Sequence, residues 1–275
     1  MTSLKDRVSG FCRAAGLRLN TDLGQHYLID ETVLDAIVDR AAIAPGATVV
    51  EVGTGIGVLT ERLLAAGARV KTIELDPRVI PLLTAFVEAP KWEGKLEIVE
   101  GNALEVPFPS EPYKVVANIP YHITSPLLRH VFLESPRPPE TMTLRIQREV
   151  AERICDPKDR GLLTVVVSLF GAPSIVRHVP PASFLPPPAV DSSVIHIECF
   201  EKPLADGPTL DALLSLLKLG FGQKRKMLRN TLGSLPDGDA LLAAAGIDAT
   251  RRPQTLTTDE WIALARVRAA GTGNA

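Results

Sequence analysis

Hydrophobic and polar positions alternate between helical periodicity and short β-branched runs along the first two thirds of the chain. Residues 31–42 carry an apolar stripe at helical spacing from Val33 to Val38, which predicts an amphipathic helix that Pro45-Gly46 ends. Short β-branched runs then predict strands at residues 47–53, 68–75, 95–101, 113–118 and 141–147. Helical periodicity returns between them, at residues 57–67 and 124–134.

A further helix is predicted from Asp76-Pro77 onward, with the aspartate as N-cap and the proline in the first turn. Strands that alternate with helices imply right-handed crossovers and a parallel sheet covered on both faces, so the predicted class is α/β. Two later runs, 174–179 and 192–200, could form an antiparallel pair at the sheet edge. The segment "LLTVVVSLFG" at 162–171 suits either a strand or a buried helix.

The pattern changes around residues 201–210. From Thr209 onward the leucines have helical spacing and no β-rich run follows. We therefore expect two domains: an α/β domain at 1–203, which begins with an N-terminal arm at 1–30, and a helical domain at 204–275.

Composition and charge narrow the functional classes. A net charge of −2 among 275 residues provides no overall basic field, so any nucleic-acid contact must come from local patches. The 3 cysteines show no metal-ligand spacing and no disulfide framework, which fits a reducing, cytoplasmic location. No apolar run approaches the roughly 18 residues of a membrane span, and the acidic residues near the N-terminus argue against a transit peptide. We expect no metal and no membrane contact.

The stretch "EVGTGIG" places Gly53, Gly55 and Gly57 between a strand and a helix. Glycines there let the backbone turn tightly and approach a ligand, although a simple packing turn is the alternative. The spacing is neither that of dinucleotide-binding folds nor that of a phosphate-binding P-loop. Glu74 ends the second strand, where a carboxylate can accept hydrogen bonds from a ribose diol; the alternative is a solvated carboxylate.

Acidic side chains gather at the predicted strand ends. Glu51, Glu74 and Asp76 all lie there, and the glycine loop contains neither lysine nor arginine. Phosphates would favour the opposite charge, whereas a cationic ligand suits this arrangement. The sulfonium cofactor S-adenosylmethionine, which also carries an adenosine, fits these requirements.

The four residues Asn118-Ile119-Pro120-Tyr121 end the fourth predicted strand. The Asn118 side-chain oxygen and the Ile119 carbonyl could accept hydrogen bonds from the exocyclic amine of an adenine. They would thereby free its lone pair for attack on a methyl group. Tyr121 offers a ring on which a flipped base can stack, and Pro120 fixes the turn. The alternative is a strand-end turn with an asparagine cap.

Six motifs together resemble the ribosomal RNA adenine dimethyltransferase family, and within it the KsgA/RsmA subgroup of small-subunit enzymes. They are "LGQHYLID", "EVGTGIGVLT", "IELD", "NIPYHITSP", "FLPPPAVDSS" and "FGQKRKMLRNTL". The resemblance implies a class I, Rossmann-like methyltransferase with a seven-stranded sheet and a small all-helical C-terminal domain. It also implies a helix at 162–171. The implied methyl donor is S-adenosylmethionine, and the implied substrates are two adjacent adenosines in a 16S rRNA hairpin of a pre-ribosomal particle. We expect a monomer.

The resemblance also assigns residues to the site. It places cofactor contacts on His26, Leu28, Gly53, Gly55, Glu74, Asn102 and Asn118. It assigns catalytic roles to Asn118, Ile119 and Tyr121, with Phe184 stacking the target base from the side opposite Tyr121. Three positions depart from the usual motifs: His26 replaces asparagine, Asn102 replaces aspartate, and Ala189 replaces lysine. An asparagine oxygen at 102 can still accept a hydrogen bond, but without charge assistance.

A basic segment follows in the helical domain, with Lys224, Arg225, Lys226 and Arg229. In a slightly acidic chain it predicts contact with the RNA backbone, although a solvated helix face is the alternative. The N-terminal arm, basic at Lys5, Arg7, Arg13 and Arg18, is a weaker candidate for the same contact.

Two other functions remain open. One is a macrolide-resistance methyltransferase acting on large-subunit (23S) rRNA, against which the "FGQKRKMLRNTL" segment and the modest pI argue. The other is a non-catalytic assembly or transcription factor that keeps the fold as an RNA clamp. The intact Glu74 and Asn-Ile-Pro-Tyr motif argue against it.

Overall fold

The computed structural model describes residues 3–17, 25–158, 160–223 and 225–272. The chain divides into two compact units, each treated by itself below. The first unit comprises 1–152 with 172–199, and the second comprises 153–171 with 200–275. The second unit thus begins near the predicted boundary at 203 but also takes up residues 153–171. The division of labour between a catalytic and an RNA-contacting domain stays a prediction.

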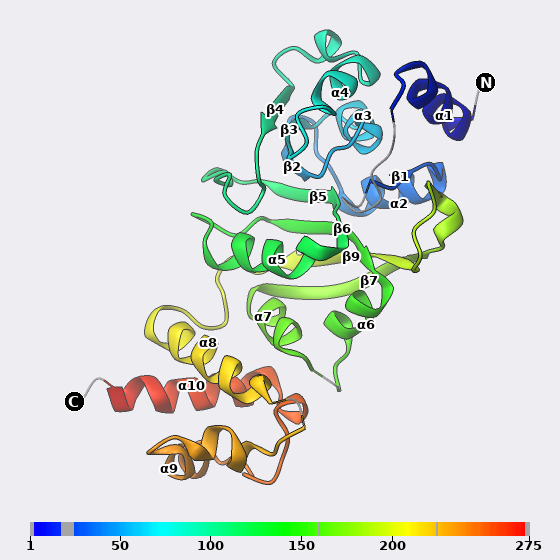
Figure 1. Ribbon diagram of the computed structural model, residues 1–275. Coiled ribbons are helices and arrows are strands. Elements are labelled where there is room, and N and C mark those ends of the chain that lie inside the picture. Colours follow the sequence, from blue (N-terminus) through cyan, green and yellow to red (C-terminus); the bar gives the residue numbers. More distant parts are fainter. Residues whose placement is uncertain (1–2, 18–24, 159, 224, 273–275) are drawn as a thin grey trace. The chain divides into compact units, whose positions relative to one another are not determined.

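A seven-stranded sheet forms the centre of the first unit, as the family resemblance implies (Figure 1). Its order is β4-β3-β2-β5-β6-β9-β7, with bounds Leu96–Glu100, Arg69–Glu74, Thr48–Val52, Lys114–Asn118, Thr141–Gln147, Ser192–Cys199 and Gly171–Val179. The five strands from β4 to β6 run parallel. β9 runs antiparallel to β6, from Thr141 opposite Glu198 to Gln147 opposite Ser192.

The edge pair β9 and β7 confirms the expectation of two adjacent late strands. Hydrogen bonds join Ser174 to His196 and His178 to Ser193, so residue numbers rise along one strand as they fall along the other. The two strands are therefore antiparallel. A separate two-stranded sheet pairs β1 (Tyr27–Leu28) with β8 (Phe184–Leu185).

Helices surround these sheets and fill the second unit. In chain order they are α1 Leu4–Ala14, α2 Glu31–Ala41, α3 Val58–Ala65, α4 Ile80–Phe86, α5 Thr124–Leu133, α6 Arg148–Cys155, α7 Leu162–Phe170, α8 Gly207–Gly222, α9 Gly238–Ala244 and α10 Thr258–Thr272. Short 3₁₀ helices are η2 Ala89–Trp92, η3 Tyr121–Ile123, η4 Pro181–Ser183, η5 Leu228–Asn230, η6 Leu232–Ser234 and η7 Pro253–Thr255. The described part of residues 204–275 contains helices and turns but no strand, as predicted.

The ambiguous segment at 162–171 is the helix α7, as the family resemblance implies. Its β-branched residues Val165, Val166 and Val167 are all fully buried, so the helix is apolar around most of its circumference. The Thr164 hydroxyl accepts the Gly161 N–H at 3.1 Å and thus satisfies an amide that the first turn leaves unpaired. Burial of most of the helix surface outweighs the intrinsic strand preference of its valine residues.

The predicted helix start at Asp76-Pro77 is wrong by one turn, because α4 begins at Ile80. The Asp76 side chain accepts the Arg78 N–H at 3.1 Å, and its carbonyl accepts the Val79 N–H at 3.0 Å. These bonds close a separate turn before the helix. An aspartate that bonds to the amide two residues on stabilises a turn as readily as a helix N-terminus, so the motif alone does not distinguish them.

Candidate active site

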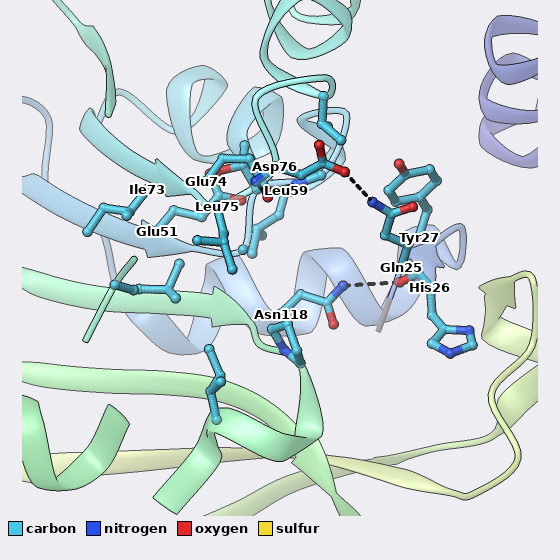
Figure 2. Close-up of a pocket in the computed structure, with 18 of the residues that line it drawn as sticks. Gln25, His26, Tyr27, Glu51, Leu59, Ile73, Glu74, Leu75, Asp76 and Asn118 are labelled. Atoms are coloured by element: carbon cyan, nitrogen blue, oxygen red, sulfur yellow. Dashed lines mark hydrogen bonds between the residues drawn. The ribbon is translucent and has the colours of Figure 1, made fainter. Parts of the chain in front are cut away.

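A cavity of about 330 Å³ opens at the carboxyl ends of β2, β3 and β5 (Figure 2). β2 lies between β3 and β5, where the chain order of the strands reverses, and open α/β sheets bind ligands at such points. All the residues that the sequence assigns to cofactor contact line this cavity: His26, Leu28, Gly53, Gly55, Glu74, Asn102 and Asn118. Among the predicted catalytic residues, Asn118 lines it, whereas Ile119, Tyr121 and Phe184 do not.

The glycine loop combines close packing with a backbone that only glycine adopts easily. Gly53, Gly55 and Gly57 have φ values of 73°, 57° and 95°. A Cβ at Gly55 would come within 2.6 Å of the Tyr27 ring, and one at Gly57 within 2.5 Å of Leu83. Part of the glycine requirement is therefore packing. The loop backbone nevertheless remains exposed to the cavity at Gly53 and Gly55, where a ligand can approach it.

Glu74 is held rigidly at the end of β3. One carboxylate oxygen accepts the Gly55 N–H at 3.0 Å, and the other accepts the Asp76 N–H at 3.0 Å. Each oxygen of a carboxylate has a second lone pair, so the group retains capacity for the two hydroxyls of a ribose. These bonds fix the carboxylate before any ligand arrives, which lowers the entropic cost of binding.

The other two acidic groups contribute less charge than the sequence suggests. Burial raises the pKa of Glu51 to about 8, even though the Thr60 hydroxyl donates to its carboxylate at 2.6 Å. This shift favours the protonated form, so Glu51 carries less negative charge than the sequence suggests. Asp76 pairs with Arg78 at 2.8 Å. Among the described acidic residues of the cavity wall, Glu74 is the remaining carboxylate without a basic partner.

Two bonds orient the Asn118 side chain at the end of β5. Its amide nitrogen donates to the His26 carbonyl at 3.4 Å, as Figure 2 shows. Its oxygen accepts a hydrogen bond from Nε of Arg145. The two bonds define which end of the amide is the acceptor, an assignment that atomic positions alone leave open. The Ile119 side chain is fully buried and anchors the turn that follows.

Pairing of β1 with β8 brings two distant motifs together. Leu28 lies opposite Phe184, so the "GQHYL" stretch borders the "FLPPP" stretch. His26 Nδ1 lies 2.8 Å from the Pro186 carbonyl. Because a carbonyl only accepts, Nδ1 carries the hydrogen of this bond. The histidine that replaces the usual asparagine thus keeps a bond to this loop.

The other two positions that differ from the family motifs are Asn102, in the cavity wall, and Ala189, outside it. The Asn102 side chain bonds within its own loop, accepting the Leu104 N–H at 3.0 Å and donating to Glu105 at 2.9 Å. Its oxygen keeps a second lone pair, so it can still accept from a ligand in the cavity. Ala189 lies exposed beyond β8.

Sequence reasoning missed Arg145 on β6. The side chain is 2 % exposed, and burial lowers its pKa to about 10. Its guanidinium carbon lies 4.7 Å from the centroid of the Tyr121 ring and 4.9 Å from that of Phe184. These are the two rings to which the sequence assigns the target base. The signal was present in the sequence as a charged residue inside the otherwise uncharged strand "TMTLRIQ".

The basic segment lies in the second unit. Lys224 lies outside the described residues. Arg225 and Lys226 are exposed in a turn after α8, and Arg229 is exposed on the 3₁₀ helix η5. Among the described residues these three form no salt bridge. Buried Leu228 anchors the segment, with its N–H donating to the Arg251 carbonyl at 2.8 Å.

The described residues contain no group of three or more histidine, cysteine, aspartate and glutamate side chains placed to hold a metal ion. In the same part of the chain, no helix is long and apolar enough to span a membrane.

A mostly parallel seven-stranded sheet with a cavity at its switch point is a Rossmann-like architecture, and its similarity to solved rRNA methyltransferases gives the class of protein. Two solved structures support this class. One is 23S rRNA methyltransferase ErmE, with a TM-score of 0.70 and 27% identity over 88% of this chain and 98% of that one. The other is a dimethyladenosine transferase from Plasmodium falciparum, with a TM-score of 0.74 and 28% identity over 87% of this chain and 96% of that one.

Sequence comparison then identifies the family. The chain belongs to the ribosomal RNA adenine dimethylase family, whose model matches residues 16–269. Ribosomal RNA small subunit methyltransferase A of Dehalococcoides mccartyi is 39% identical over 269 residues, covering 95% of this chain and 91% of the relative. The protein of the same name from Brucella suis is 43% identical over 253 residues, covering 88% and 90%. The resemblance seen in the motifs is confirmed.

Proposed function

We propose that this protein transfers methyl groups to the N6 amines of two adjacent adenosines in a small-subunit (16S) rRNA hairpin. The observation that carries the proposal is the position of Asn118. Its oriented amide borders a cavity that also exposes the Gly53–Gly55 backbone and Glu74. The curated relatives at 39% and 43% identity, named for the small subunit, support this choice of substrate.

We propose S-adenosylmethionine as the methyl donor. When bound, it would supply an activated methyl group on a cationic sulfur. Three features fit it: the glycine loop lets a ligand approach the backbone, Glu74 offers acceptors for a ribose diol, and Asn102 offers one for an adenine amine. The paired or protonated state of Asp76 and Glu51 leaves Glu74 as the main anionic group facing the ligand.

Asn118 and Ile119 would activate the target amine. The lone pair of an adenine N6 is delocalised into the ring, so the amine is a weak nucleophile. The Asn118 oxygen and the Ile119 carbonyl would accept its two N–H groups and hold the nitrogen in line with the methyl group. As the N–C bond forms and the S–C bond breaks, N6 loses one proton, which passes to solvent. A second round gives the dimethylated base.

Tyr121 and Phe184 would hold the flipped base by stacking on it, and the hydroxyl of Tyr121 is itself fixed by Ser192 at 2.8 Å. Arg225, Lys226 and Arg229, together with Lys224, would contact the RNA backbone. The exposure of the three described residues and their lack of acidic partners support this role.

The test is methyl transfer with labelled S-adenosylmethionine to purified small and large ribosomal subunits that lack the modification, followed by mass mapping. We expect two dimethylated adenosines on the small subunit. Label on the large subunit alone would identify a macrolide-resistance-type enzyme instead. Tight small-subunit binding without any transfer would identify an assembly factor. We further propose that the enzyme acts in the cytoplasm, within pre-ribosomal particles, as a monomer, which light scattering of the purified chain tests.

A further inference from the structure

Arg145 is unusual among the buried residues of the first unit because its charge has no acidic partner. No carboxylate among the described residues forms a salt bridge with it, although the side chain is 2 % exposed. A guanidinium removed from water ordinarily needs a paired carboxylate to offset its lost hydration. The partners of Arg145 are neutral instead. They are the Asn118 oxygen, the Ser192 hydroxyl at 3.5 Å, and the rings of Tyr121 and Phe184.

These are the groups that the proposed function assigns to the target adenine. Adenine would stack on Tyr121 and Phe184 and donate its N6 hydrogen to Asn118. The guanidinium does the same, because it is planar, stacks on aromatic faces and donates N–H bonds in its own plane. In the structure it lies within 4.9 Å of both ring centroids while Nε donates to the Asn118 oxygen.

We propose that Arg145 occupies the adenine site of the RNA-free enzyme and that the target base displaces it. This inference rests on the proposed function. The Asn118 oxygen is satisfied in both states, because it exchanges an Nε–H donor for an N6–H donor. Simultaneous occupancy is disfavoured, since the guanidinium lies within 4.9 Å of both ring centroids, where the base would stack.

Displacement makes Arg145 a specificity-determining residue. Every adenine must compete with an internal group that is always present at the site, which reduces the apparent affinity of the site. A base that the correct RNA holds in position therefore displaces Arg145 at a lower concentration than a free adenine nucleoside does. The residue therefore raises KM without taking part in methyl transfer.

The first experiment uses the wild-type protein saturated with sinefungin, an unreactive analogue of the methyl donor, and free adenosine as probe. ¹⁵N NMR identifies the Arg145 Nε–H resonance by its absence from Arg145→Lys. We expect this resonance to move toward the position of a solvent-exposed arginine as adenosine binds. Saturable adenosine binding with the resonance unmoved would overturn the proposal. The titration itself uses only the wild-type protein, and Arg145→Lys is needed only to assign the resonance.

The second experiment measures steady-state kinetics on unmodified small subunits with Arg145→Met, which keeps an unbranched side chain but removes the charge. We expect KM to fall by roughly tenfold with kcat unchanged, because a desolvated cation–π contact no longer competes with the base. Arg148→Met is the matched control, since Arg148 is exposed on α6 and pairs with Glu152 at 2.7 Å. It should leave both constants unchanged.

A fall in kcat at constant KM for Arg145→Met would mean that Arg145 positions Asn118 during catalysis, and displacement would be refuted. The proposed function fails separately, through absence of methyl transfer by the wild-type enzyme to the small ribosomal subunit. The resonance experiment would still decide whether adenosine displaces Arg145.

Discussion

Removing the Glu74 carboxylate should weaken cofactor binding, and the structure indicates by how much. The carboxylate accepts two backbone N–H groups, from Gly55 and Asp76, and faces the cavity with its remaining lone pairs. Hydrogen bonds to a charged acceptor contribute about 1.5–3 kcal/mol each, so losing one ribose bond corresponds to roughly a 10- to 150-fold loss of affinity. Glu74→Ala should therefore bind S-adenosylmethionine at least tenfold more weakly.

Glu74→Gln separates charge from shape. A glutamine has one acceptor oxygen, so it can satisfy Gly55 or Asp76 but not both, and its NH₂ group would face the other N–H. An unsatisfied buried donor costs about 1–3 kcal/mol, so we expect a lower melting temperature in addition to weaker binding. The loss of affinity should be similar to that of Glu74→Ala, despite the nearly unchanged volume.

Isothermal titration with S-adenosylmethionine and thermal unfolding of the free protein measure the two effects. Glu100→Gln is the matched control, because Glu100 is the exposed register partner of Glu74 on β4 and lies outside the cavity. It should change neither quantity. If folded Glu74→Ala binds the cofactor within twofold of wild type, Glu74 does not hold the ligand and the reasoning is refuted.

Three further predictions concern catalysis, stability and RNA binding. Asn118→Ala should lower the single-turnover methyl-transfer rate by about 100-fold or more, since it removes an acceptor used in the transition state; a rate within a few-fold of wild type would contradict this. Glu51→Gln should flatten the pH dependence of stability. Because the folded protein holds a proton on Glu51 that the unfolded chain releases, the contribution of Glu51 to stability should be lost as pH rises from 4.5 to about 8. The difference in urea unfolding between wild type and Glu51→Gln across that range measures it. Changing Arg225 and Lys226 together to Ala should reduce the slope of log RNA affinity against log salt by about 0.7–0.9 per lost phosphate contact, with cofactor affinity unchanged as the internal control. An unchanged slope would show that the RNA backbone contacts another part of the protein.

The sequence by itself determined the central strands of the sheet, most of the helices between them, and their order along the chain. Alternating β-branched runs and helical stripes predicted β2 to β6 and the helices α2, α3 and α5, because side-chain periodicity is a local property that burial enforces. It also indicated the cavity residues at strand ends, since carboxyl ends of parallel strands meet at one edge of a sheet. The family resemblance, carried by motifs in order, supplied the helix at 162–171 and the count of seven strands.

Only the tertiary structure decided how these groups act on one another. The pKa of Glu51 depends on burial, which no local pattern reports, and the turn at 77–79 depends on hydrogen bonds that compete with helix formation. The contact of Arg145 with Asn118, Tyr121 and Phe184 joins three separate parts of the chain. Such contacts arise from strand pairing and packing between residues far apart in sequence. A charged residue in a strand therefore shows its role only when its neighbours in space are known.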